Sequence, residues 1–291
     1  MWPVVLNRTG AVFLAITVLA VFGAGSVGFY DWQHRLDVNV PRPKTSSVVA
    51  GPKTPSPTTR ASAAPTPAPT PLPASTLIQR VPFTVQAPTG NWDSEHQEYC
   101  EAAAIYMVGQ YFQGNRADRI PPPQADADMG KIVAYERATV PRINLSLADM
   151  AQVTSHFYGL QGQVVPVDAQ LIQRQVAEGK PVILALTTHG GPAGRINPAY
   201  GADNVYHVLV VTGYDNAKGI VYTNDPGLSQ GQNLAYPWAT LQAAIEAQTR
   251  TPVDGAGYPV PTQQGASMLV LQPAPQPSPP PAPAPTQKPR Q

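Results

Sequence analysis

Proline is distributed very unevenly along this 291-residue chain, and the distribution limits how much of it can fold. Of 35 prolines, ten lie between Pro41 and Pro73 and nine between Pro273 and Pro289. The other residues of the first run are mainly Ala, Thr and Ser, and neither run has enough large apolar side chains to offset the entropy of ordering. We therefore predict extended, largely disordered chain over 31–76 and 273–291, and one globular domain over 77–272.

Charge and cysteine content exclude several classes of protein. The formal net charge is +1 and the domain has no basic stripe, so nucleic acid is not expected as a partner. The only cysteine is Cys100, which excludes an internal disulfide and a multi-thiolate metal site. His96 and His189 lie in loops without further ligands at suitable spacing, so we expect no metal and no other cofactor.

An uncharged apolar segment precedes the first proline-rich run. After a short tail (1–9), residues 10–30 form a run of 21, GAVFLAITVLAVFGAGSVGFY, about the length that crosses a bilayer as a helix. Ala24, Gly25 and Ser26 offer a signal-peptide cleavage site, but the run is long for a signal core and the cleavage pattern is poor. We predict a retained single-pass signal anchor, with cleavage and secretion as the alternative.

The charges beside this segment do not by themselves place the domain outside the cell. Arg8 precedes the segment, whereas Arg35, Arg42 and Lys44 follow it, a count that favours a tether on the inside. A Pro/Ala/Thr spacer of about 45 residues, which reaches ~140 Å as polyproline helix, is nevertheless typical of a domain displayed beyond a membrane. We therefore expect an extracytoplasmic domain, with the membrane and the cell wall as further contacts.

Helical patterns come first in the domain and β-strand patterns follow. Apolar periodicity predicts helices over 100–113, 147–159 and 168–179, each with a closing glycine, and a last helix late in the chain over 238–248. β-branched and aromatic runs predict strands over 181–186, 205–214, 220–224 and 267–272. This order predicts an α+β domain in which an N-terminal helix that carries the cysteine packs on an antiparallel sheet.

Cys100 stands where an irregular segment turns into the first helix. A helix begins with unpaired N–H groups and a partial positive charge, so a thiol in its first turn ionises more easily. The next residue, Glu101, acts in the opposite direction, because a carboxylate beside a thiol opposes thiolate formation. We expect Glu101 to point into solvent or into a salt bridge, and Cys100 is a candidate nucleophile.

His207 lies inside an apolar strand, where a histidine is by default a packed core residue, but its neighbours favour a catalytic role. If 215–219 (DNAKG) is a five-residue hairpin loop, Tyr214 faces Ile220 and His207 faces Gly227 on the next strand.

This pairing places Asp225 on the same face as His207, one diagonal step away and within side-chain reach. A carboxylate there holds one imidazole nitrogen and leaves the other to accept a thiol proton. A one-residue slip in register would present Asn224 instead. The plainer interpretation of Asp225 is the opening residue of an NDPG turn.

Four segments in this order resemble the C39-like branch of the papain-like cysteine peptidases, which is related to the leader-removing peptidase domains of bacteriocin exporters. They are VPFTVQAP with a later Trp and CEAAAIYMVGQYF, then GKPVILAL, HVLVVTGYD and VYTNDPG. The resemblance covers about 77–272. It implies a papain-like α+β fold with Cys100 as nucleophile, His207 as base and then acid, and Asp225 as the residue that orients His207.

The resemblance also implies an upstream glutamine that forms the oxyanion hole with the backbone N–H of Cys100. The exporter peptidases carry it six residues before the cysteine, where this chain has Ser94. Gln86, in the segment that matches the opening motif of the family, is the preferred candidate, and Gln97 is the alternative.

Together these features predict a membrane-tethered, extracytoplasmic cysteine hydrolase, most specifically a peptidase that acts on peptide or protein substrates through a thioester acyl-enzyme. Two alternatives remain open. The same thioester can transfer its acyl group to an amine, or the domain can be a catalytically silent cell-surface binding module. The Gly/Pro-rich loop 189–204, which directly precedes the strand of His207, is predicted to form a rim of the substrate groove.

Overall fold

The structure is a computed structural model that describes residues 71–190, 194–261 and 265–275. The predicted anchor (10–30) and nearly all of the predicted linker and tail lie outside these ranges. None of the helices in the described part of the chain is both long and apolar enough to span a bilayer.

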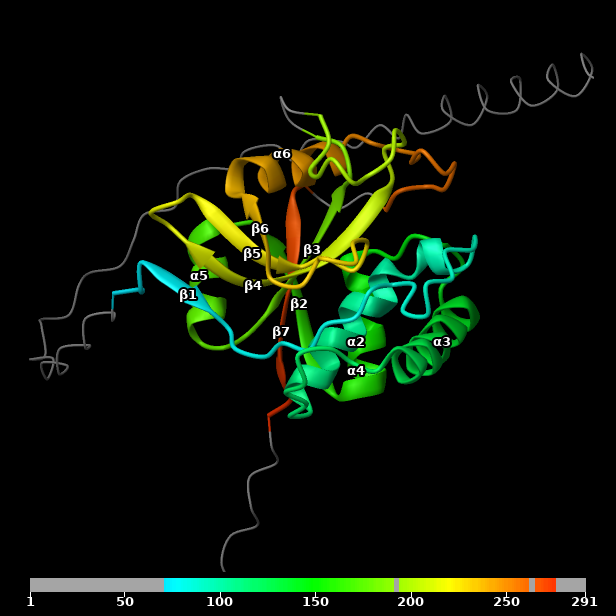
Figure 1. Ribbon diagram of the computed structural model, residues 1–291, viewed down its shortest axis with the longest axis horizontal. Helices are drawn as coiled ribbons and strands as arrows, with labels where there is room; N and C mark the ends of the chain where they lie inside the picture. Colours follow the sequence, from blue (N-terminus) through cyan, green and yellow to red (C-terminus); the bar gives the residue numbers. More distant parts are fainter. Residues whose placement is uncertain (1–70, 191–193, 262–264, 276–291) are drawn as a thin grey trace, which may run out of the picture. The chain divides into compact units, whose positions relative to one another are not determined.

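A seven-stranded antiparallel sheet forms the centre of the described chain (Figure 1). The order along the sheet is β2-β7-β3-β4-β5-β6, and β1 also pairs with β4. β4 therefore has three partners, and it is the strand that carries His207. The strands are β1 (Ser75–Leu77), β2 (Leu160–Pro166), β3 (Val182–Thr187), β4 (Tyr206–Asp215), β5 (Ile220–Asn224), β6 (Leu234–Pro237) and β7 (Ser267–Pro273).

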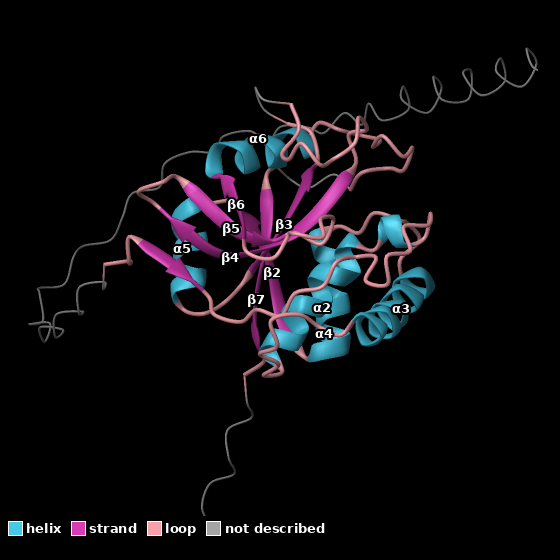
Figure 2. Ribbon diagram, viewed as in Figure 1, coloured by secondary structure: helices cyan, strands magenta, loops and turns pink. Residues whose placement is uncertain are grey.

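Helices cover both faces of this sheet (Figure 2). One face packs against α2 and α4, with α3 packed on these two helices, and the other face packs against α5 and α6. The helices are η1 (His96–Glu98), α2 (Cys100–Phe112), α3 (Pro122–Thr139), α4 (Leu147–Tyr158), α5 (Ala169–Ala177) and α6 (Trp238–Gln248).

The central strand β3 is apolar at nearly every position because both of its faces are buried. Ile183 and Ala185 join the core beneath α2, whereas Val182, Leu184 and Leu186 join the core beneath α5 and α6. Successive side chains of a strand point to opposite faces, so a strand covered on both sides needs an unbroken apolar run.

The fold class predicted from the sequence is confirmed, and each predicted helix and strand is found within about two residues of its expected ends. The prediction missed α3 and the short strands β1, β2 and β6. In α3 the opening prolines and an internal Gly130 obscure an apolar stripe that begins with Ala125, Met129 and Ile132. Proline at the first helical position is compatible with a helix, because that N–H has no intrahelical acceptor. β1 begins before the predicted start of the domain at 77.

The hairpin of β4 and β5 differs from the predicted pairing near its turn. Asp215, and not Tyr214, pairs with Ile220, so the predicted five-residue loop is one residue too long. A β-bulge between Val211 and Gly213 then adds one residue to β4.

These two differences cancel farther along the hairpin. Val210 pairs with Asn224, which is the register that the original loop length also implied. Asn224 therefore points to the face of Val210, and the next residue, Asp225, points to the face of His207. Asn224 is buried, where its side chain donates to the Val81 carbonyl and accepts from the Asn233 N–H.

Helix α2 contains one glycine, Gly109, that packs directly against α4. A Cβ at this position would overlap the ring of Tyr158.

Gly130 in α3 offers a matched comparison, since nothing lies within 4 Å of its missing Cβ. We expect Gly109→Ala to lower the free energy of unfolding by about 1–3 kcal/mol through overpacking. Gly130→Ala is expected to raise it by up to about 1 kcal/mol, because alanine is the better helix former. Urea unfolding followed by circular dichroism measures both values. Equal stability of Gly109→Ala and the wild type would contradict this close approach of α2 and α4.

Candidate active site

The end of β5 and the start of β4 bring Asp225 and His207 into contact. His207 Nε2 lies 2.8 Å from Asp225 Oδ1, and the two residues are 3% and 0% exposed. The contact engages Nε2, and no hydrogen bond to Nδ1 is found among the described residues. Nδ1 is therefore the ring nitrogen that can accept a proton.

Three further donors hold the Asp225 carboxylate. The hydroxyls of Tyr200 and Tyr236 donate to Oδ1 at 2.7 Å and to Oδ2 at 2.6 Å, and the Gly227 N–H donates to Oδ1 at 3.0 Å. Burial raises the pKa of Asp225, but the charge and hydrogen bond of His207 and the two tyrosine hydroxyls outweigh it, so the pKa lies below its usual value. Asp225 thus remains an acceptor suited to orienting His207.

Tyr200 and Tyr236 are site residues that were not predicted from the sequence. Tyr200 belongs to the loop 189–204, and its hydroxyl also lies 2.9 Å from His207 Nε2. Tyr236 is on β6, a strand not predicted from the sequence, and it pairs with Val221 of β5. The sheet order places Tyr236 at Asp225 and the path of the loop places Tyr200 there, and nothing in their local sequence signals these contacts.

Cys100 is the first residue of α2 and is 4% exposed. Its thiol donates to Glu101 Oε2 at 3.0 Å, and among the described residues it has no hydrogen bond to His207. Burial raises the pKa of Cys100 well above its usual value, the charges of Glu101 and Glu98 raise it further, and the Val208 backbone N–H lowers it. The thiol is therefore in its neutral form, and it lies beside Val208, the residue that follows His207 on β4.

The expectation that Glu101 points into solvent or a salt bridge is wrong. Its side chain is 2% exposed, and Oε1 accepts a hydrogen bond from the Leu145 N–H at 2.9 Å. Burial raises the pKa of Glu101, although the hydrogen bonds from Cys100 and Leu145 act against the rise. A main-chain donor just before α4, far away in the sequence, thus draws the carboxylate inward beside the thiol.

Of the two candidate glutamines, Gln86 is buried and Gln97 is exposed. Gln86 Nε2 donates to the carbonyls of His96 and Gln97 at 3.0 and 2.7 Å, so both of its amide hydrogens are engaged. Its Oε1 is buried without a partner. The Gln97 side chain donates to the Trp92 carbonyl at 3.1 Å. Among the described residues, the backbone N–H of Cys100 has no acceptor, so it is a free donor beside the sulfur.

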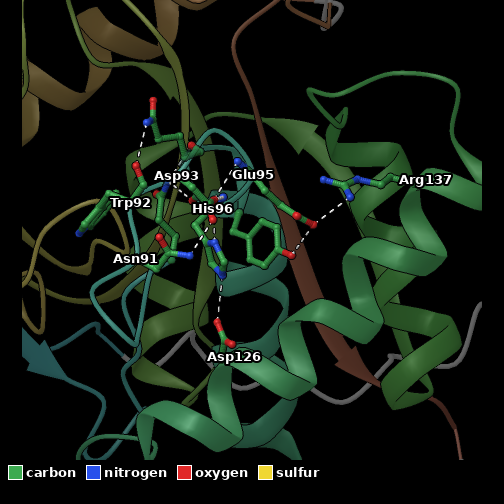
Figure 3. Close-up of polar contacts among 10 residues, drawn as sticks. Asn91, Trp92, Asp93, Glu95, His96, Asp126 and Arg137 are labelled. Carbon is green, nitrogen blue, oxygen red and sulfur yellow. Dashed lines mark hydrogen bonds and ion pairs between the residues drawn. The ribbon is translucent and has the colours of Figure 1, made fainter.

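The segment before Cys100 is held by charged side chains (Figure 3). His96 lies between Asp93 and Asp126, with Nδ1–Oδ1 at 2.8 Å and Nε2–Oδ1 at 3.0 Å. Burial lowers the pKa of His96, but the hydrogen bonds and charges of the two aspartates outweigh it and raise the pKa above its usual value. Through Asp126 the segment is tied to α3.

A pocket of about 380 Å³ lies beside His207. His207 and both candidate glutamines line it, together with Trp92 and Glu98. Tyr200 and Gly201 also line it, so described residues of the loop 189–204 form part of its wall, and their role as the rim of a substrate groove stays a prediction. The pocket is large enough to admit several atoms of a substrate beside the imidazole.

Comparison with known proteins gives a family for this arrangement. The model of the Peptidase_C39 like family matches residues 78–252. Among solved structures, a protein described as a C39-like peptidase from Bacillus anthracis is 14% identical, with a TM-score of 0.43 over 69% of this chain and 99% of that chain. Xylellain, a cysteine protease from Xylella fastidiosa, is 11% identical, with a TM-score of 0.30 over 70% of this chain and 87% of that chain. No curated protein matches the chain. The family model spans more than half of the sequence, and the chain therefore belongs to the Peptidase_C39 like family.

Proposed function

We propose that this chain is a peptidase that cleaves peptide bonds through Cys100, His207 and Asp225. The family supports a cysteine peptidase-type function and a peptide or protein substrate. The observation that carries the finer proposal is the 2.8 Å contact between the buried His207 Nε2 and Asp225 Oδ1. The N–H of Val208, the next residue of β4, lowers the pKa of the Cys100 thiol, so the sulfur lies near this strand.

In the proposed acylation, the Cys100 thiol gives its proton to His207 Nδ1 and the sulfur attacks the carbonyl carbon of the scissile bond. The Cys100 N–H stabilises the oxyanion that forms. Gln86 becomes the second donor when its Nε2 releases the carbonyl of His96 or Gln97; Gln97 is the alternative donor. His207 then gives its proton to the leaving amine, the C–N bond breaks and a thioester remains.

Deacylation uses the same residues with water. His207 Nδ1 takes one proton from the water molecule, and the hydroxyl attacks the thioester carbon. The C–S bond breaks, the acid product leaves and the proton returns to the sulfur. Asp225 holds Nε2 throughout and so fixes the imidazole tautomer.

The hydrogen bond from Cys100 to Glu101 defines a resting state in this proposal. The thiol must turn from Oε2 of Glu101 toward His207 before its proton can be transferred. The same contact, with the raised pKa of Cys100, favours a second candidate function, a catalytically silent binding module.

We further propose that residues 10–30 anchor the domain to a membrane and that the domain lies outside the cytoplasm. The support is the uncharged apolar run followed by the proline-rich spacer. Fusion of a reporter that is active only outside the cytoplasm, placed after residue 76, is expected to give activity in the membrane fraction. Activity only from a cytoplasmic reporter at the same position would contradict the proposed orientation.

Peptide cleavage tests the proposed activity directly. We expect the wild type to cleave members of a mixed peptide library and Cys100→Ala to cleave none, with the products identified by mass spectrometry. Asp225→Ala is expected to lower kcat by up to ~10⁴-fold, because no acceptor then fixes the imidazole tautomer. Gln86→Ala is expected to lower turnover by about 100-fold or more if Gln86 donates to the oxyanion. An unchanged rate would remove Gln86 from the mechanism, and Gln97→Ala is the matched test.

The wild type and Cys100→Ala also separate the alternatives. Acyl-amine products formed in the presence of an added amine would favour transfer over hydrolysis. A wild type that binds peptides but cleaves none, and that forms no adduct with an electrophilic peptide probe, would favour the silent module.

Glu101→Gln tests the resting state. Glutamine keeps an oxygen for the Leu145 N–H but removes the negative charge beside the thiol, so the pKa of Cys100 is expected to fall. Because thiolate reacts and thiol does not, iodoacetamide labelling below the pKa speeds up about tenfold for each unit by which the pKa falls. The midpoint of the labelling rate against pH reports the shift. An unchanged midpoint would show that Glu101 does not control the thiol, and Glu246→Gln, an exposed site on α6, is the control.

A further inference from the structure

Helix α3 carries a carboxylate at a position where its own pattern calls for an apolar side chain. The inward stripe of the helix consists of Ala125, Met129, Ile132 and Val133, and Glu136 continues it one turn later. Glu136 is 8% exposed, and its Oε1 is buried without a hydrogen-bond partner. A buried acceptor without a donor is costly, so the residue calls for an explanation.

Glu136 lines a pocket of about 210 Å³ together with Glu98, Tyr99, Ile143 and Tyr258. Among the described residues, neither glutamate carboxylate of this group takes part in a hydrogen bond or ion pair. The volume is far above the roughly 10–15 Å³ that a single water requires. Tyr99, Val133, Ile143 and Tyr258 form the aromatic and aliphatic part of its wall, and Ser94, Glu95, Arg137 and Arg142 line the rest.

The arginines that line this pocket are already paired. Arg137 donates to Glu95 Oε1 at 2.9 Å (Figure 3), and Arg142 Nε lies 3.5 Å from Asp149 Oδ2. The pocket carboxylates without a hydrogen bond or ion pair among the described residues are therefore those of Glu98 and Glu136. A pocket that combines aromatic and aliphatic surface with two such acceptors fits a cationic group on an apolar stem, as in a lysine or arginine side chain.

The same pocket adjoins the proposed active site. Glu98 also lines the larger pocket that contains His207, and it lies two residues before Cys100. A peptide bound beside His207 can thus place one side chain over Glu98 and toward Glu136. No group of three or more metal-ligating side chains is found among the described residues, so a cationic side chain accounts for the pocket better than a metal ion does.

From this geometry we propose that Glu98 and Glu136 form a specificity subsite for a lysine or arginine side chain of the substrate. The proposal rests on the peptidase function proposed above and adds the class of substrate.

The raised pKa values of the two glutamates agree with a site that binds a cation. Burial raises the pKa of Glu98 to about 7, with the charges of Glu101 and Asp254 adding to the rise. Burial likewise raises the pKa of Glu136 to about 8, and Glu101 adds to it while Arg137 opposes it. A cation bound between the two carboxylates would favour their ionised forms and displace their protons.

Peptide substrates that differ in one side chain test the subsite. Each position of a cleaved peptide is varied among arginine, lysine and their uncharged counterparts citrulline and norleucine. We expect one position at which arginine or lysine raises kcat/KM about tenfold or more over the neutral counterpart. Glu136→Gln and Glu98→Gln should each remove most of that ratio, whereas Glu246→Gln should keep it. Cleavage without such a position, or a ratio that both variants keep, would overturn the proposal.

A binding experiment separates this proposal from the proposed activity. Calorimetry with acetyl-arginine-amide and acetyl-citrulline-amide is expected to show tighter binding of the arginine compound to the wild type, with the difference lost in Glu136→Gln. If arginine is preferred but no peptide is cleaved, the activity fails and the subsite remains. Equal affinities of the wild type for the two compounds would overturn the subsite even where peptides are cleaved.

Thermal unfolding shows whether Glu136→Gln folds and whether the ionised Glu136 carboxylate destabilises the folded chain. The pKa of Glu136 is raised from 4.5 to about 8 in the folded chain, so the stability conferred by its bound proton is lost as the pH rises through about 8. Glu136→Gln should therefore melt above the wild type at alkaline pH, and the gap should close toward acid pH. A variant that melts below the wild type throughout would show that Glu136 is structural.

Discussion

The hydrogen bonds to the buried Asp225 carboxylate connect several strands and loops at the proposed active site. It is fully buried, so its charge is tolerated only because His207, Tyr200, Tyr236 and the Gly227 N–H all approach it. These donors come from β4, β6, the loop 189–204 and the turn after β5. The bulge in β4, the pairing of β6 and the path of the loop must all be correct for the carboxylate to be satisfied.

Three glutamates of η1, α2 and α3 have fewer hydrogen-bond donors than Asp225. Glu101 has two donors, one of them the thiol itself, whereas Glu98 and Glu136 have none among the described residues. Their fields and their burial favour neutral forms, and the field of Glu101 also acts on Cys100. Asp225 thus stays ionised because its charge is compensated, whereas the glutamates favour their neutral forms. Enzymes use such a contrast to give carboxylates different roles.

The sequence was sufficient to predict the α+β class and the shared face of His207 and Asp225, because strand alternation and hairpin geometry are local rules. The predicted loop was one residue too long, and an unforeseen bulge compensated for it. Other features depend on partners far along the chain. Glu101 turns inward because of Leu145, and Gln86 is engaged by the carbonyls of His96 and Gln97. Such contacts follow from the assembled fold, so no local pattern predicts them.

Glu136 shows how a broken pattern can itself be informative. A leucine or methionine at this inward position would bury apolar surface against its neighbours on α3 and remove the cost of an acceptor without a donor. Packing and stability alone therefore argue against the residue that is present. Side chains that contradict their local pattern without an evident structural gain are expected mainly at functional sites. Here the contradiction stands at a pocket that shares Glu98 with the wall around His207, which is where selection by the substrate would act.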